Sequence, residues 1–200
     1  MKPIIFNTEM VKAILEGRKS RFTKVISYGL YIDYTDTMNE HSVEFAKNYC
    51  DLDDCSKDIK ETFIKYHGKY KVDDVLYVKE TFAIKENGRI LYKADYEDGF
   101  DIKYHWRTEW RKSTHLKREN ARIFLKVTNV RAERLQDIEF CDVFKEGIEL
   151  IQTDGSDKAC GDRNLKAFNN FVNLWDLTAK DGYKYLDNPY VFVYTFEKLQ

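Results

Sequence analysis

A short run of cations and hydroxyls near the N-terminus has the composition that best suits chemistry in this sequence. The run follows Gly17 directly and comprises Arg18, Lys19, Ser20, Arg21, Thr23 and Lys24. Cationic and hydroxyl side chains on one short connection are typical of loops that hold phosphate groups. What this basic run can do depends on the elements that fix its two ends.

A helix is predicted before the basic run and a strand after it. The apolar residues Met10, Val11, Ile14 and Leu15 recur at helical spacing and predict a helix over residues 9–16, with Asn7 or Thr8 as its cap. Gly17 predicts the end of that helix, because glycine adopts left-handed dihedrals without steric cost. Residues 25–28 are expected to be extended. A structural role for Arg18 and Lys19 is the alternative, since cations at a helix end interact favourably with its dipole.

A carboxylate at the end of a predicted strand is the second candidate for chemistry. Leu76 and Val78 alternate along the apolar residues 75–79, so they face the core, and Glu80 falls on the same face. A buried carboxylate needs a partner, since an isolated buried charge is costly. We predict that Lys19 is the partner of Glu80.

A second basic segment covers residues 107–122 and contains aromatic side chains. Its candidates for binding a nucleic acid are Trp110, His115, Arg118 and Arg122, with Trp106 and Tyr92 as further stacking candidates. Stacking on an aromatic ring contributes about 1–3 kcal/mol per base, and arginines bind phosphates. Core packing of the tryptophans and ion pairs of the arginines are the structural alternatives.

Several segments, in this order along the chain, resemble the ASCH domain, a relative of the PUA RNA-binding domains. They are the turn Gly17-Arg18-Lys19-Ser20, the strand ending in Lys79-Glu80-Thr81, the segment from Trp110 to Ile123, the turn Arg134-Leu135-Gln136-Asp137-Ile138 and the final Asn188-Pro189-Tyr190-Val191-Phe192-Val193. The resemblance covers most of the chain and is closest to stand-alone ASCH proteins of bacteria and their prophages. It implies an α+β fold, a PUA-like bent β-barrel with flanking helices, whose cleft is lined by the Lys19 turn.

The resemblance also implies an enzymatic possibility. Small bacterial members of the family are acetylcytidine amidohydrolases with a Lys/Thr/Glu arrangement, in which the lysine helps a threonine hydroxyl attack an amide carbonyl. The lysine corresponds to Lys19 and the glutamate to Glu80, whereas the threonine position is occupied by Phe22. Phenylalanine cannot be a nucleophile, so a shift of one residue in the turn would have to present Thr23. The catalytic candidates are therefore Lys19, Glu80 and Thr23.

Binding is the function that we predict from the sequence. RNA or a modified nucleoside would lie in a cleft between the Lys19 turn and the Glu80 strand, contacted by Ser20, Arg21, Lys24, Trp110, His115, Arg118 and Arg122. The alternative is an enzyme, either an acetylcytidine amidohydrolase or a ribonuclease with Lys19, Arg21 and His115 as its reactive groups. A third interpretation is an interaction module whose cleft is filled by Phe22.

Composition limits the remaining possibilities. The 200 residues fit one domain, and the formal net charge of −1 means that any nucleic-acid contact must come from a local patch. Cys50, Cys55, Cys141 and Cys160 match no zinc template, so we expect no metal and no cofactor, with a Cys50–Cys55 metal or redox pair as the alternative. No apolar run has the length of about 18 residues that a membrane span needs. We expect a cytoplasmic protein with no membrane partner.

The remaining elements complete the predicted fold. Residues 33–67 are expected to form a helical insertion that either packs outside the sheet or acts as a lid. Asn87-Gly88 predicts a hairpin between residues 82–84 and 90–94. Strands are predicted over residues 122–131 and 190–196. One helix is predicted from Asp142 through Ile148, with Gly147 near its end, and another over residues 164–178, with a loop over residues 153–162 between them.

Overall fold

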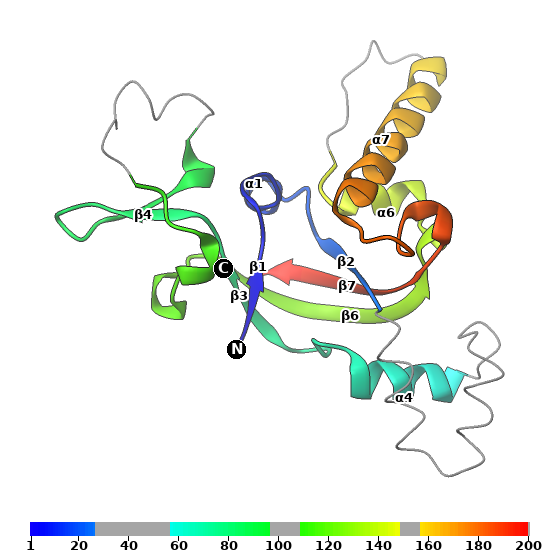
Figure 1. Ribbon diagram of the computed structural model, residues 1–200, viewed down its shortest axis with the longest axis horizontal. Helices are drawn as coiled ribbons and strands as arrows, with labels where there is room; N and C mark the ends of the chain where they lie inside the picture. The colour runs from blue at the N-terminus through cyan, green and yellow to red at the C-terminus, as the bar shows by residue number, and fades with distance from the viewer. Residues whose placement is uncertain (27–56, 97–108, 149–156, 200) are drawn as a thin grey trace.

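The computed structural model describes residues 1–26, 57–96, 109–148 and 157–199, which form an α+β fold (Figure 1). The strands of this part of the chain are β1 (Lys2–Ile5), β2 (Arg21–Val25), β3 (Val75–Lys79), β4 (Phe82–Ile84), β5 (Ile90–Tyr92), β6 (Phe124–Arg134) and β7 (Tyr190–Lys198). Its α-helices are α1 (Thr8–Leu15), α4 (Lys57–His67), α6 (Phe140–Lys145) and α7 (Asp157–Thr178). The predicted α+β class is confirmed.

The main sheet has five strands in the order β1-β3-β6-β7-β2. β1 pairs with β3 in parallel, and the other neighbours are antiparallel. Figure 1 shows α4 on one side of this sheet and α1, α6 and α7 on the other. β4 and β5 form a separate two-stranded sheet. The basic run follows α1, so it begins on the side of the sheet that carries α1, α6 and α7 (Figure 1).

Strand β7 is buried on both faces, and its alternation supplies two hydrophobic cores. Tyr190, Phe192, Tyr194 and Phe196 belong to the larger core, which also receives side chains from α1, α4 and the other strands of the main sheet. Val191 and Val193 point to the other face and pack in the core beneath α6 and α7. This two-sided burial follows from the period of two in a β-strand.

The two outer strands of the main sheet approach each other through aromatic rings. Phe6, which follows β1, contacts Phe22 of β2 edge to face, with 5.8 Å between ring centroids. The ladders of the described residues do not pair β1 with β2, so the sheet is curved but a closed barrel is not seen. Both rings belong to the larger core.

Several local predictions are confirmed. The Asn7 side chain caps α1 by accepting a hydrogen bond from the Met10 amide at 2.8 Å, and Gly17 ends the turn after the helix with φ of 76°. β4 and β5 form the hairpin predicted from Asn87-Gly88.

Two helix starts differ from the prediction. α6 begins at Phe140, before Asp142, because Glu139 takes the extended N-cap conformation. α7 begins at Asp157, so the second half of the loop predicted over residues 153–162 is helical. The polar, glycine-containing composition of that stretch suggested a loop, yet polar residues are also common at the cap and in the first turn of a helix.

Only the end of the predicted insertion over residues 33–67 lies within the described residues, and it forms α4. Phe63 of α4 is buried and stacks near Phe192 of β7, with 5.7 Å between ring centroids. α4 therefore packs against the sheet, as the first of the two predicted roles requires. Residues 33–56, with Cys50 and Cys55, lie outside the described part of the chain, as do His105 and Trp106.

Candidate functional site

Lys19, Arg21 and Thr23 occupy alternate positions along the basic run, so their side chains share one face of the chain. Phe22 points to the opposite face and is buried among the rings of Phe6 and Tyr194. The side chains of Lys19 and Arg21 are themselves buried, with residue exposures of 3% and 1%. Alternation thus directs a lysine, an arginine and a threonine together toward α6.

Glu146, the residue that ends α6, joins Lys19 to Thr23. The Lys19 Nζ atom donates to the Glu146 Oε2 atom at 3.0 Å and to the Glu146 carbonyl oxygen at 2.7 Å. The Thr23 hydroxyl donates to the other carboxylate oxygen, Oε1, at 2.5 Å. One carboxylate therefore accepts from an ammonium on one side and from a hydroxyl on the other. We call Lys19, Thr23 and Glu146 the Lys19–Thr23–Glu146 cluster.

Backbone contacts hold the end of α6 against the basic run. Lys19 and Glu146 form an isolated antiparallel bridge, and the Ser20 amide donates to the Lys145 carbonyl at 2.9 Å. The Arg18 Nη1 atom donates to the Gly147 carbonyl at 2.9 Å. These bonds fix the Glu146 backbone relative to Lys19 and Thr23, so the cluster does not depend on side chains alone.

Arg21 lies between Lys19 and Thr23 and contacts three carboxylates. Its Nη2 atom donates to Glu133 Oε1 at 2.9 Å, its Nη1 atom pairs with Asp142, and its Nε atom lies 3.6 Å from Glu146 Oε1. Burial raises the pKa of Asp142, but hydrogen bonds from Lys145 and Arg21 and their charges outweigh burial and hold that pKa below its usual range. Asp142 is therefore ionised beside Arg21 at neutral pH.

A cleft of about 660 Å³ opens beside this cluster, and we call it the Thr23 cleft. Its walls come from the start of α1, the end of α6, β2 and the last turns of α7. The lining residues are Asn7, Glu9, Met10, Arg18, Thr23, Glu146, Gly147, Ile148, Asn170, Phe171, Asn173, Leu174, Trp175 and Thr178. Thr23 and Glu146 reach the cleft, whereas Lys19 stands behind them with a side chain that is fully buried.

The predicted pair between Lys19 and Glu80 is wrong. Glu80 is buried at 1% exposure, as expected, but its carboxylate accepts two hydrogen bonds from Arg122 at 2.9 and 3.0 Å. Among the described residues no hydrogen bond or ion pair joins Glu80 to Lys19. The physical reason is that each side chain already has a different partner of opposite charge. Lys19 pairs with Glu146, and Glu80 pairs with Arg122.

The side chain of Arg122 is bound by neighbouring side chains of the fold. It binds Asp95 at 2.7 and 2.8 Å in addition to Glu80, and its guanidinium lies 4.1 Å from the centre of the Tyr92 ring. Burial lowers the pKa of Arg122, but hydrogen bonds and charges of Glu80 and Asp95 raise it overall. Arg122 is thus engaged by two carboxylates, which was the structural alternative for this residue.

The other predicted binding residues are spread over the surface. Lys24 is exposed on β2, and Ser20 contributes its backbone to the sheet by accepting from the Phe196 amide. Trp110 is half-buried beside Tyr96, with 5.9 Å between ring centroids. His115 and Arg118 are exposed on two short 3-10 turns. None of these five residues lines the Thr23 cleft.

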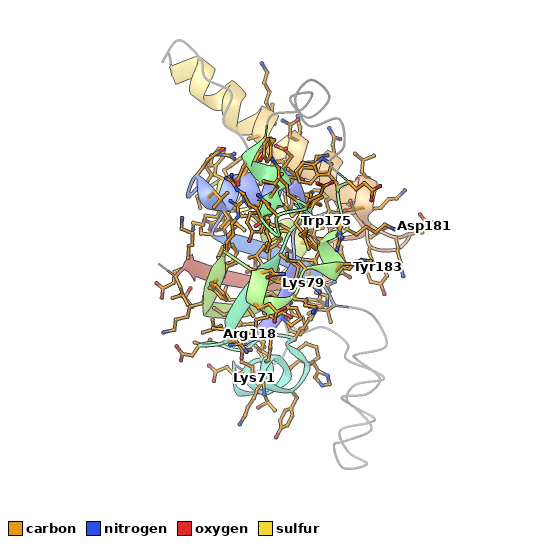
Figure 2. The ribbon with its side chains drawn as sticks, turned by 90° about the vertical axis from the view of Figure 1, so that its left-hand side faces the viewer. Lys71, Lys79, Arg118, Trp175, Asp181 and Tyr183 are labelled. Carbon is orange, nitrogen blue, oxygen red and sulfur yellow. The ribbon has the colours of Figure 1, made fainter. Side chains whose placement is uncertain are left out.

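The basic turns and the α7 wall of the cleft lie in different parts of the molecule. Figure 2 labels Arg118 in the lower part of the view and Trp175 above it. Trp175 is held in place by its indole Nε1 atom, which donates to the Tyr183 carbonyl at 2.9 Å. The basic turns of the second basic segment therefore do not form one continuous site with the Lys19–Thr23–Glu146 cluster.

Sequence reasoning missed Glu146, Glu133 and Asp142. One signal for Glu146 was present: it directly precedes Gly147, whose φ of 90° ends α6, and it follows the turn of residues 134–138 that resembles an ASCH motif. A carboxylate at the end of a short helix after a family motif was a candidate partner for Lys19.

Comparison with known proteins adds no relative. No protein-family model, no curated protein and no solved structure matches the chain. Among the residues described, no group of three or more His, Cys, Asp or Glu side chains could hold a metal ion. No described helix combines the length and the apolar character that crossing a membrane demands.

Proposed function

We propose that this protein binds a modified nucleoside in the Thr23 cleft and hydrolyses an acyl amide carried by that nucleoside. The observation that carries the proposal is the 2.5 Å hydrogen bond from the Thr23 hydroxyl to Glu146, whose second oxygen accepts from Lys19 at 3.0 Å. A hydroxyl bonded to a carboxylate at the wall of a cleft has the geometry of a nucleophile with its general base. The resemblance to ASCH amidohydrolases supports the same reaction.

Each group in the proposed reaction has one role. The Thr23 oxygen attacks the amide carbonyl carbon while its proton passes to Glu146. The carbon–nitrogen bond then breaks, the proton on Glu146 passes to the departing nucleoside amine, and the acyl group remains as an ester on Thr23. Water then attacks the ester carbonyl while Glu146 takes its proton, and Glu146 returns that proton to the Thr23 oxygen as the ester bond breaks, which releases the carboxylic acid and restores the hydroxyl. Lys19 does not touch the substrate and acts by holding Glu146 in place.

The charges beside Thr23 support an uncharged ligand rather than a phosphate. Lys19 and Arg21 are the buried cations of this region, and their partners are Glu146, Glu133 and Asp142. Cations already bound to carboxylates have little capacity left to neutralise a phosphodiester. A free nucleoside therefore fits the cleft better than a polynucleotide backbone.

The α7 wall supports recognition of a base. Phe171, Leu174 and Trp175 give the cleft an apolar side, and the amide side chains of Asn170 and Asn173 line the same wall. Small-molecule sites commonly combine apolar walls with a few polar groups that fix orientation. Amides can donate to and accept from the edge of a base, so this wall suits a planar heterocycle.

The test is hydrolysis of acetylcytidine by the purified protein, followed by chromatography of cytidine. We expect wild-type turnover and a loss of about 100-fold or more in Thr23→Ala and Glu146→Gln, because each removes a reacting group. Thr128→Ala is the control, since Thr128 is an exposed threonine on β6 that does not line the cleft. Absence of wild-type turnover, or full turnover by Thr23→Ala, would contradict the reaction. Binding of acetylcytidine without turnover would leave a nucleoside-binding protein.

A second candidate function is RNA binding at the exposed basic turns. Arg111, Lys112, Lys117 and Arg118 are all exposed and lie within eight residues of one another. Clustered exposed cations bind phosphates with a strong dependence on salt. A titration with single-stranded RNA at low salt tests this function, with Lys112→Ala and Arg118→Ala expected to weaken binding and Lys180→Ala as the control for an exposed lysine elsewhere. RNA affinity that is unchanged in both Lys112→Ala and Arg118→Ala would contradict this function.

We propose further that the main sheet is the PUA-like bent barrel of an ASCH protein. The contact between Phe6 and Phe22 supports this, because it joins the two outer strands across the larger core. The cysteine pattern supports the cytoplasm as its compartment, since it fits neither a disulfide framework nor a zinc site.

A further inference from the structure

Two nitrogens of the buried Arg21 side chain, Nε and Nη1, have no hydrogen-bond acceptor in the described structure, and Nη1 is compensated by its ion pair with Asp142. The Nε atom is buried and makes no hydrogen bond within the described structure, although it lies 3.6 Å from Glu146 Oε1. That oxygen is the one to which Thr23 donates at 2.5 Å. Buried donors are rarely left without an acceptor, so this arrangement needs an explanation.

We propose that Arg21 is a positioning residue for Glu146. The inference rests on the reaction proposed above, in which the Thr23 oxygen leaves Glu146 to attack the substrate. When the Thr23 donor turns away, the Arg21 Nε–H remains next to the same carboxylate oxygen and keeps it in place. Lys19 holds the other oxygen at 3.0 Å, so the carboxylate is fixed from both ends during the reaction.

The two remaining sides of the guanidinium are fixed by anchors from other elements. Glu133 of β6 accepts from Nη2 at 2.9 Å, and Asp142 of α6 pairs with Nη1. Outer cations hold both anchors: Arg131 contacts Glu133 at 3.1 Å, and Lys145 contacts Asp142 at 3.1 Å. Because arginine is planar, fixing two of its nitrogens also fixes the direction of the third.

Asp142 and Glu146 lie four residues apart, and Arg21 pairs with the first and faces the second. The guanidinium therefore holds the end of α6 against β2 and β6 at the place where Glu146 meets Thr23. A lysine at position 21 carries the charge but lacks the fork that can face three carboxylates at once. The inferred role thus depends on the shape of the side chain as well as on its charge.

The experiment compares Arg21→Lys and Arg21→Met with the wild type in acetylcytidine hydrolysis. A misplaced general base lowers kcat, and displacement by about 1 Å can cost about 100-fold. We expect this loss of kcat in Arg21→Met, a smaller loss in Arg21→Lys and a KM within about twofold of the wild type, because the cleft walls are unchanged. Unchanged kcat in both variants would overturn the role.

A second readout does not need turnover. The Thr23 hydroxyl proton is hydrogen-bonded to Glu146, so it should exchange slowly with water and give a resonance by NMR. We expect Arg21→Met and Arg21→Lys to weaken or abolish that resonance. The matched control is Arg122→Lys, which perturbs another buried Arg–Glu pair and should leave the Thr23 resonance in place. If the wild type has no turnover but the Arg21 variants lose the resonance, the proposed reaction fails and the positioning role stands. An unchanged resonance in Arg21→Lys would overturn the role even if Arg21→Met does not fold.

Discussion

Gly147 lies so close to Lys19 that a side chain at residue 147 would crowd against it. A Cβ atom on Gly147 would lie 3.1 Å from the Lys19 Cβ and 2.9 Å from the Ala13 Cβ. Gly147 also has a φ of 90°, a conformation that side chains with a Cβ rarely adopt. The close approach of the end of α6 to the basic run therefore depends on a glycine directly after Glu146.

Gly147→Ala should destabilise the fold and disturb the Lys19–Thr23–Glu146 cluster together. The strain at positive φ and the crowding against Ala13 each oppose the native backbone, so we expect a loss of about 2–3 kcal/mol in the free energy of unfolding. Urea unfolding measures this loss. Gly88→Ala is the control, because Gly88 has a similar φ of 79° but open space around it. An equal loss in both variants would mean that crowding against Lys19 and Ala13 contributes nothing.

Phe22→Thr should not create the nucleophile that the family pattern has at this position. Phe22 faces the larger core and stacks on Tyr194 with 4.7 Å between ring centroids, so a threonine there would be buried away from Glu146. Loss of the ring should cost about 3–4 kcal/mol of stability. Thermal unfolding measures the cost, and acetylcytidine turnover above the wild-type rate would contradict the assignment of Thr23.

This position shows what the sequence could and could not predict. The helix cap at Asn7, the hairpin at Asn87-Gly88 and the burial of Glu80 depend on local pattern, and all three are confirmed. The basic run was predicted to be a connection, whereas residues 21–25 form β2, and the alternation that brings Lys19 and Thr23 to one face was not foreseen. The partner of Lys19 could not be derived from local pattern, because Glu146 is 127 residues away and only the packing of α6 brings it close.

Burial of β7 on both faces was equally hard to predict. Its sequence from Tyr190 to Phe196 is apolar or aromatic at almost every position, which is consistent with a strand but does not reveal what covers each face. α4 contributes Phe63 to the core on one face and α7 contributes Phe171 to the core on the other, and both contacts join segments far apart in the sequence. The approach of the two outer strands of the main sheet likewise depends on long-range packing of Phe6 and Phe22.

Arg122→Met should destabilise the fold by about 3 kcal/mol. It would leave Glu80 buried without its partner, and removing one member of a buried ion pair is strongly destabilising. Chemical denaturation measures the change. The double variant Arg122→Met with Glu80→Met should recover much of the loss, because it removes the unpaired charge. No recovery would show that the packing of Arg122 on Tyr92 carries the stability.

The carboxyl of Asp142 makes the free energy of unfolding depend on pH in the acid range. The pKa of its carboxyl lies below the ordinary value of 3.8, because contacts with Lys145 and Arg21 outweigh burial. The unfolded chain therefore binds this proton first, so stability is present above the ordinary value and is lost as pH falls toward the lower folded value. Urea unfolding between about pH 6 and pH 3 should show this loss, and Asp142→Asn should reduce the slope. Asp181→Asn is the control, since Asp181 is fully exposed and projects at the edge of the molecule in Figure 2.

The hydroxyl of Tyr70 makes the free energy of unfolding depend on pH in the alkaline range, where stability falls as pH rises. Burial, with smaller contributions from Tyr194 and Asp74, raises the pKa of its hydroxyl from 10.0 to about 12. That hydroxyl donates to the Pro3 carbonyl at 2.7 Å and so joins the segment before β3 to β1. The folded protein keeps its proton where the unfolded chain loses it, so stability is constant below pH 10 and falls between about pH 10 and 12. Unfolding midpoints followed by fluorescence should show this fall, and Tyr70→Phe should flatten it while lowering stability at neutral pH. An alkaline slope that is identical in Tyr70→Phe would assign the loss to other buried groups such as Tyr194, whose pKa is also raised by burial.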